Sequence, residues 1–373
     1  MMLTKEKLKL FFAGTFISVL TFFLLFAGLE LFLRIFKIQS DNFLAQDPVL
    51  GWTHLSDKTG YSIGEGYKVK RRLNKDGFIG PDYDYAKPQN VYRIVIAGDS
   101  LTEAFQVEEA DSYPALTEKK INDSGTAQKT EILNMGIAGY GTQRELYVLE
   151  NKGLKFNPDI FVLAFFTGND FEDNLDEIDK KAIFTAEQKF KNKIKLFLRN
   201  HFASWRFILR LKSRNNFLAY LKNNGNSEAG GSGYDPIFKK EYSGKTEKLI
   251  EKSEKLLLEF KNLADKNGKD HLVLILPSAG QVYLDGKNDY DPEKANKILK
   301  NFFEKQGINY IDLLPDLKNS YKLNSEKDLY FPLDGHPNEN GHLVISNRLA
   351  DYFIKLISNQ NVFVKRALGL PQN

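Results

Sequence analysis

Four short polar motifs in this sequence contain residue types that could carry out nucleophilic catalysis. In chain order they are "GDS" at 98–100, "NMGIAG" at 134–139, "GND" at 168–170 and "DGH" at 334–336. A serine hydroxyl is a weak nucleophile until a base removes its proton, and a histidine oriented by a carboxylate is such a base. The residue types therefore point to acyl transfer at Ser100, with His336 as the base and Asp334 as the acid that orients it.

An alternation of apolar and amphipathic segments predicts the elements that must hold these motifs. We expect strands, some with their following turns, at 92–98, 130–139, 158–170, 270–278 and 308–315, and helices at 112–123, 142–154, 245–268, 292–307 and after 342. Strands that alternate with helices predict a three-layer α/β/α fold around a mostly parallel sheet of about five strands. Functional residues of such sheets lie at the carboxyl ends of the strands, where the first three motifs are expected.

In this order and at these strand ends, the four motifs resemble those of the SGNH, or GDSL-type, hydrolase superfamily, in a membrane-anchored bacterial branch. The resemblance covers roughly residues 90 to 355, apart from an insert. It implies a flavodoxin-like fold, an acyl-serine intermediate, and an oxyanion hole made by the backbone N–H groups of Ser100 and Gly139 and the side-chain amide of Asn169. Each such donor, aimed where negative charge develops, is worth on the order of 10²–10³ in rate. We expect no cofactor and no metal.

Simpler interpretations exist for each motif. Ser100 could be a helix N-cap, which is a common role for a serine after a strand, and Asn169 could cap a loop. The superfamily usually places the acid three residues before the histidine, whereas Asp334 precedes His336 by two. Some envelope-polysaccharide acetylation branches show the shorter spacing, but Asp312, at the end of the fifth predicted strand, is an alternative acid.

The remaining acidic residues and histidines are expected to be structural. The acidic run at 170–173 resembles a metal cluster at first sight, but its spacing fits no common site, so we predict a solvated acidic loop. We expect His342 on the face of a helix. His54, His201 and His271 lie apart from the four motifs, and the sequence assigns them no role.

The N-terminus predicts a single transmembrane helix. Three lysines precede residues 10–29, which carry no charge, and a helix of that length covers the ~30 Å hydrocarbon core of a bilayer. The run is longer than the ~7–15 apolar residues of a cleaved signal peptide, which is the main alternative. We therefore predict a cytoplasmic tail and anchor at 1–37 and an extracytoplasmic domain, periplasmic or at the cell surface. The positive-inside bias is modest, because basic residues also follow the span.

Two further segments accompany the predicted hydrolase domain at 91–373. Residues 38–90 are expected to form a lead-in of short strands and turns packed on that domain, because their aromatic side chains need burial. An insert at about 180–240 contains a basic stretch, 189–222, with apolar residues at helical spacing and no acidic residue. Its apolar stripe either packs on the domain or belongs to a lid that lies on anionic lipid headgroups.

Composition excludes several classes of function. A net charge of +4 is small for 373 residues, and no nucleic-acid-reading motif is present, so we expect no nucleic-acid partner. The absence of cysteine excludes disulfides, Cys-ligated zinc and cysteine nucleophiles. The main hypothesis is a serine-dependent hydrolase of an acyl ester, carried by an envelope glycan or lipid. An O-acyltransferase of a cell-envelope polysaccharide and a non-catalytic envelope-binding protein on the same fold are the alternatives.

Overall fold

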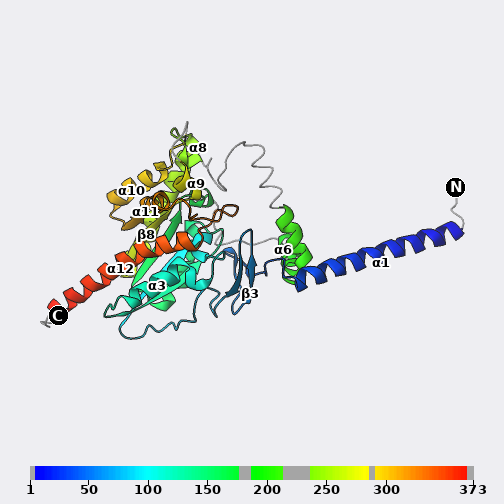
Figure 1. The fold of residues 1–373 in the computed structure, drawn as a ribbon, viewed down its shortest axis with the longest axis horizontal. Coiled ribbons are helices and arrows are strands. Elements are labelled where there is room, and N and C mark those ends of the chain that lie inside the picture. Colours follow the sequence, from blue (N-terminus) through cyan, green and yellow to red (C-terminus); the bar gives the residue numbers. More distant parts are fainter. Residues whose placement is uncertain (1–4, 176–185, 213–235, 285–289, 368–373) are drawn as a thin grey trace. The chain divides into compact units, whose positions relative to one another are not determined.

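A computed structural model describes residues 5–175, 186–212, 236–284 and 290–367 (Figure 1). The chain forms two compact units. The first comprises Met1–Asn42, Gly60–Ile63 and Phe184–Asn226, and the second comprises Phe43–Thr59, Gly64–Ile183 and Ser227–Asn373.

Helices dominate the described part of the first unit. Helix α1 (Lys5–Ile35) is long and apolar enough to cross a membrane, and most of its side chains are exposed. The predicted apolar N-terminal helix is therefore confirmed as a candidate membrane span. Helix α6 (Ala186–His201) and a second helix at 203–212 cover part of the predicted basic insert, while residues 180–185 and 213–235 of that insert lie outside the described residues.

A five-stranded parallel sheet forms the centre of the second unit. Its strands are β5 (Val91–Gly98), β6 (Lys129–Gly136), β7 (Ile160–Phe166), β8 (Asp270–Leu276) and β9 (Tyr310–Asp312). The order across the sheet is β6-β5-β7-β8-β9, and every neighbouring pair is parallel. This is the flavodoxin-like strand order, so the predicted fold class is confirmed. The strands are nearly continuous apolar runs because helices cover both faces.

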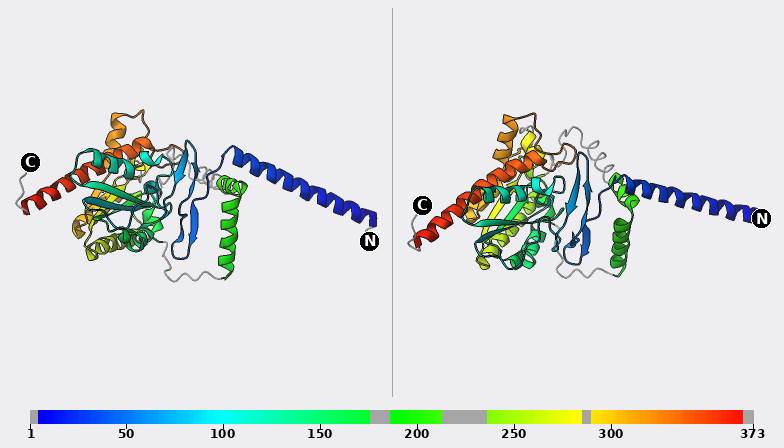
Figure 2. Two further views of the ribbon diagram at one scale, coloured as in Figure 1. Left: turned by 90° about the horizontal axis from the view of Figure 1, so that it is seen from below. Right: turned by 60° about the horizontal axis from the view of Figure 1, so that its bottom comes forward.

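Alternate residues of the strands face two separate cores, and helices cover both sides of the sheet (Figure 2). One face packs against α4 (Thr142–Asn151), α8 (Gly244–Lys266) and α10 (Lys294–Gln306). The other packs against α3 (Tyr113–Asp123), α9 (Ala279–Tyr283), α11 (Leu314–Leu323) and α12 (Glu339–Ala367). Two one-turn helices, α2 (Ser100–Glu103) and α5 (Asp170–Asp173), follow β5 and β7 directly.

Local capping explains where the elements differ from the prediction. β9 ends early because the Asp312 carboxylate accepts from the Leu314 backbone N–H at 3.1 Å, and Pro315 then opens the unpredicted helix α11. α12 begins earlier than predicted because the Asn338 side chain accepts from the backbone N–H groups of Asn340 and Gly341, at 2.9 and 3.2 Å.

The lead-in contains the expected short strands: β1 (Leu44–Asp47), β2 (Gly51–His54), β3 (Thr59–Ile63) and β4 (Lys68–Arg72). β1 and β2 pair as an antiparallel hairpin within the second unit.

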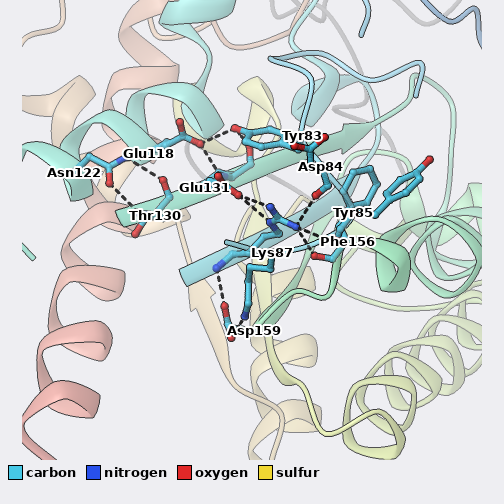
Figure 3. Close-up of polar contacts among 12 residues, drawn as sticks. Tyr83, Asp84, Tyr85, Lys87, Glu118, Asn122, Thr130, Glu131, Phe156 and Asp159 are labelled. Carbon is cyan, nitrogen blue, oxygen red and sulfur yellow. Dashed lines mark hydrogen bonds and ion pairs between the residues drawn. The ribbon is translucent and has the colours of Figure 1, made fainter. Parts of the chain in front are cut away.

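A buried ionic network joins the end of the lead-in to the amino end of the sheet (Figure 3). Arg93, with a side chain only 1% exposed, lies 2.6 Å from Glu131 and donates to the backbone carbonyls of Asp84 and Phe156 at 2.9 and 2.6 Å. A buried charge is tolerated only when it is paired and hydrogen-bonded, and part of this pairing comes from the lead-in. The network lies at the end of the sheet opposite the polar motifs.

Candidate active site

The strand order brings three of the four motifs to adjacent positions. β5 lies between β6 and β7, and Gly98 is in register with Gly136 on one side and Ala164 on the other. Ser100 therefore follows the central strand of this trio, with Gly139 and Asn169 following the two flanking strands. Asp99 caps α2, because its side chain accepts from the Leu101 backbone N–H at 2.9 Å.

Two glycines let the turn that carries Ser100 lie directly on the strand ends. A Cβ atom on Gly136 would lie 2.3 Å from the Glu103 backbone nitrogen, and one on Gly98 would lie 2.2 Å from the Thr102 hydroxyl oxygen. Asn134 adds a hydrogen bond from its side-chain amide to the Thr102 backbone carbonyl, at 2.7 Å. These contacts fix α2 and leave Ser100, its first residue, partly exposed.

The structure joins Ser100, His336 and Asp334 into one hydrogen-bonded chain. The Nε2 atom of His336 lies 2.8 Å from the Ser100 hydroxyl oxygen, and its Nδ1 atom lies 2.6 Å from the Asp334 carboxylate. Gly335 has a φ of +80°, which favours glycine and permits the tight turn that brings the acid beside the base two residues later. The alternative acid, Asp312, instead accepts from the side chain of Asn296 at 2.7 Å.

Two opposing effects set the basicity of His336. Burial alone would lower its pKa, but the hydrogen bond to Asp334 and the negative charges of Asp334, Asp99 and Glu103 together outweigh burial, so the pKa of His336 is raised. The side chain is still 24% exposed, which leaves the imidazole accessible to a substrate. An imidazole held in this way accepts a proton from Ser100 more readily than a free histidine would.

The proposed oxyanion donors sit on short loops. Gly139 is exposed, with a φ of +74°, and Asn169 is the N-terminal flanking residue of α5. The Asn169 side chain lowers the pKa of the buried Asp99 carboxyl, which indicates that the two side chains are close together. A side-chain amide has two N–H groups that can donate to a substrate oxygen.

Residues of the lead-in and of α2 hold the peptide groups before Gly139. The Ala138 backbone N–H donates to the Glu103 carboxylate at 3.1 Å, and His54 lies 2.7 Å from the same carboxylate oxygen. The other ring nitrogen of His54 lies 2.9 Å from the Gly77 carbonyl. On the other side, the indole N–H of Trp52 donates to the Ala138 carbonyl at 3.0 Å.

The Trp52 hydrogen bond sets the direction of the Gly139 N–H. The Ala138 carbonyl and the Gly139 N–H belong to one planar trans peptide group, so they point in opposite directions. An indole that fixes the carbonyl on one side therefore fixes the N–H on the other. Tyr140 in turn holds the tryptophan backbone through a hydrogen bond of 2.5 Å from its hydroxyl to the Trp52 carbonyl.

Three buried carboxyl groups lie behind the nucleophile. Asp99, Glu145 and Asp170 are all at most 1% exposed. Burial raises the pKa of Asp99 to about 6, and burial together with the neighbouring carboxylates raises the pKa values of Glu145 and Asp170 well above their ordinary range. Burial and mutual repulsion therefore oppose charging all three groups together, and the cluster binds protons more readily than solvent-exposed carboxylates do.

This cluster corrects one prediction. Asp170 is fully buried and accepts from the Phe166 backbone N–H at 2.7 Å, so the run at 170–173 is not a wholly solvated acidic loop. Glu172 is the exposed member. Within the described residues, no group of three histidine or acidic side chains is arranged to hold a metal ion.

His54, Trp52 and Glu103 were not predicted to be functional residues, yet these side chains position the Ala138–Gly139 peptide. Nothing in the local pattern marks His54, which becomes meaningful only through its contact with Glu103, 49 residues later. Glu103 offered a weak signal, since it lies three residues after Ser100 in the same one-turn helix. His342, expected on a helix face, lies in α12, where its ring accepts from the Tyr113 backbone N–H at 3.3 Å.

No protein-family model and no curated protein matches this sequence. Among solved structures, the chain is similar to an alpha/beta hydrolase enzyme from the metagenome of Lake Arreo, Spain, at 14% identity and a TM-score of 0.43, covering 74% of this chain and 98% of that one. An acetyl xylan esterase shares 15% identity over 70% of this chain and 98% of its own, with a TM-score of 0.42. A lipolytic G-D-S-L family member from Veillonella parvula DSM 2008 shares 16% identity over the same fractions, with a TM-score of 0.39.

Proposed function

We propose that this chain is a serine ester hydrolase of the SGNH type that works through an acyl-serine intermediate. The observation that supports the proposal is the continuous chain of hydrogen bonds from Ser100 through His336 to Asp334, with distances of 2.8 and 2.6 Å. A helix-capping serine needs no histidine partner, so these contacts favour a nucleophile over a simple N-cap.

The geometry suggests the following sequence of steps. The Ser100 hydroxyl oxygen attacks the ester carbonyl carbon while its proton passes to Nε2 of His336, and Asp334 stabilises the imidazolium that results. The oxyanion accepts hydrogen bonds from the proposed donors Gly139 and Asn169, and from the Ser100 N–H. Collapse of the intermediate expels the alcohol, which takes the proton from His336. Water then attacks the acyl-serine by the same route and releases the acid.

A reactive fluorophosphonate probe tests the nucleophile. The full chain in detergent should be labelled, the Ser100→Ala variant should not, and a Ser124→Ala variant should be labelled normally because Ser124 is an exposed residue at the end of α3. Absence of labelling in the unmodified chain would favour the non-catalytic binding protein. Turnover of an aryl acetate with and without a glycan acceptor then separates the two catalytic hypotheses, because only an O-acyltransferase passes the acyl group to a sugar hydroxyl instead of water.

We further propose that α1 anchors the protein in a membrane with the sheet domain on the extracytoplasmic side, where an ester of an envelope glycan or lipid would be the substrate. The three lysines before the span support this orientation. Because the chain has no cysteine, a Leu323→Cys variant, altered at a side chain 88% exposed in α11, carries a single thiol. A membrane-impermeant maleimide should label it from outside intact spheroplasts. Labelling only after lysis would refute this orientation.

A further inference from the structure

Helix α6 and the helix at 203–212 expose basic and apolar side chains together. Lys193, Lys195 and Arg199 are exposed on α6, and so are Ile194 and Phe197, at 44% and 54%. The apolar stripe predicted from the sequence is therefore not packed away as core at these positions. Residues 188–222 include no aspartate or glutamate to offset the positive charge.

Both helices belong to the same compact unit as α1. Arg34 of α1 donates to the His201 carbonyl at the end of α6, and Glu30 binds the start of the helix at 203–212. The Glu30 carboxylate accepts from the Ala203 backbone N–H at 2.9 Å and from the backbone N–H and hydroxyl of Ser204 at 2.8 and 2.7 Å. A carboxylate at this place caps the helix at 203–212 and neutralises the positive end of its dipole. Arg34 also donates to Glu30, at 2.6 Å, and completes the joint.

The contacts of Glu30 with Ala203 and Ser204 fix the position of these helices along the axis of α1. Glu30 is the first charged residue after the uncharged run at 10–29, so its carboxylate marks the point where α1 leaves the hydrocarbon. One turn deeper, about 6 Å along the helix, the ring of Phe26 packs on Phe202 with centroids 6.0 Å apart. If α1 spans a membrane, the connection between the two helices therefore lies at the boundary between acyl chains and headgroups.

The orientation of α6 relative to α1 also fits a position at the membrane surface. Both views of Figure 2 draw α6 running across the direction of α1. If α1 crosses the bilayer, a helix that runs across it at the level of Glu30 lies along the membrane plane. A basic amphipathic helix in that position can place aromatic and aliphatic side chains among the acyl chains while its lysines and arginines meet phosphate groups.

We propose that α6 and the helix at 203–212 form a membrane-binding surface that lies on anionic lipid headgroups, next to the point where α1 leaves the bilayer. This inference rests on the proposed anchoring by α1 and goes beyond the proposed ester hydrolysis. Charge complementarity selects anionic lipid as the occupant, and each basic side chain near such a surface contributes about fivefold in binding.

Depth-dependent quenching tests this surface in the full chain. A Phe197→Cys variant, carrying the only thiol, is labelled with an environment-sensitive fluorophore and placed in nanodiscs of phosphatidylcholine and phosphatidylglycerol with nitroxides near the headgroups. We expect strong quenching of this label. Changing Lys193, Lys195 and Arg199 together to glutamine should largely abolish the quenching, and so should high salt, which shortens the Debye length to ~3 Å at 1 M.

Two controls separate the possible failures. The same triple exchange at Lys245, Lys248 and Lys255, exposed on α8, should leave the Phe197 label quenched. A label at Phe16→Cys, within α1, should be quenched by nitroxides deep in the acyl chains and reports the anchor alone. If that label is not quenched, the anchoring itself is wrong. If it is quenched and the Phe197 label is not, or if the Phe197 label is quenched equally without phosphatidylglycerol, the inference about an anionic surface is overturned.

Discussion

Replacing Trp52 with phenylalanine tests whether the lead-in positions the oxyanion hole. The exchange removes the indole N–H that donates to the Ala138 carbonyl at 3.0 Å but keeps an aromatic ring against Tyr140, whose ring centroid lies 5.8 Å away. The triad distances do not involve Trp52, so Ser100 and His336 should remain paired. The Ala138–Gly139 peptide would then be free to rotate away from the direction that the proposed mechanism needs.

The size of the effect follows from the hydrogen bond that is lost. A neutral hydrogen bond contributes about 0.5–1.5 kcal/mol net, and about 1.4 kcal/mol corresponds to a tenfold change in rate. Losing the orienting bond should therefore lower kcat by roughly twofold to twelvefold. Complete loss of one oxyanion donor would cost on the order of 10²–10³, which sets the upper limit.

Steady-state kinetics on an aryl acetate distinguish this positioning role from a general loss of structure. We expect kcat to fall about tenfold with KM nearly unchanged, because the donor acts on charge that develops in the transition state. Trp205→Phe is the matched control, since Trp205 is the only other tryptophan and lies in the helix at 203–212. Unchanged kcat in Trp52→Phe, or a rise in KM alone, would refute the reasoning.

Three further predictions concern the other parts of the site. Ser100→Ala and His336→Ala should each abolish ester turnover, and the double variant should be hardly worse than either, because both residues serve one mechanism; a far slower double variant would contradict this. Asn169→Ala should lose roughly 2.7–4 kcal/mol of transition-state stabilisation in ester turnover but keep more of its reactivity toward a phosphonate, and an unchanged kcat would remove Asn169 from the oxyanion hole. Burial raises the pKa of Glu145 in the folded protein above its value in the unfolded chain. The contribution of Glu145 to stability is therefore present at low pH and is lost as the pH rises from about 4.3 through the folded pKa. The loss is at most about 1.4 kcal/mol per pH unit. Urea unfolding from pH 4.5 to 8 should show a shallower loss of stability in Glu145→Gln, and parallel curves for the two proteins would disprove the assignment.

Periodicity and motif position made the sheet and the triad predictable. Each parallel strand is buried on both faces and reads as an apolar run, and Ser100 follows the first of these runs by two residues. Once the strands are parallel, their carboxyl ends must meet at one edge, so the proximity of Ser100, Gly139 and Asn169 follows without knowledge of the strand order. His336 lies between α11 and α12, and its pairing with Ser100 was predicted from the residue types and the resemblance instead.

The contacts around the Ala138–Gly139 peptide were not predictable for a physical reason. Trp52 reaches Ala138 across 86 residues of sequence, and a single hydrogen bond between side chain and backbone leaves no periodic trace. The burial of Asp170 was missed because an isolated acidic run favours solvent exposure. Only the tertiary structure shows that the Phe166 N–H is available to that carboxylate.

The lead-in determines the smallest fragment of this protein that should fold and be active. A fragment that starts at Val91, the first residue of β5, would contain every strand of the main sheet and the whole triad. It would nevertheless lack Trp52 and His54, and it would leave the guanidinium of Arg93 without the Asp84 carbonyl. Such a truncation should yield a weakly folded protein with a misaligned oxyanion hole. A truncated protein that is meant to keep its activity should therefore begin no later than Phe43, ahead of the sheet.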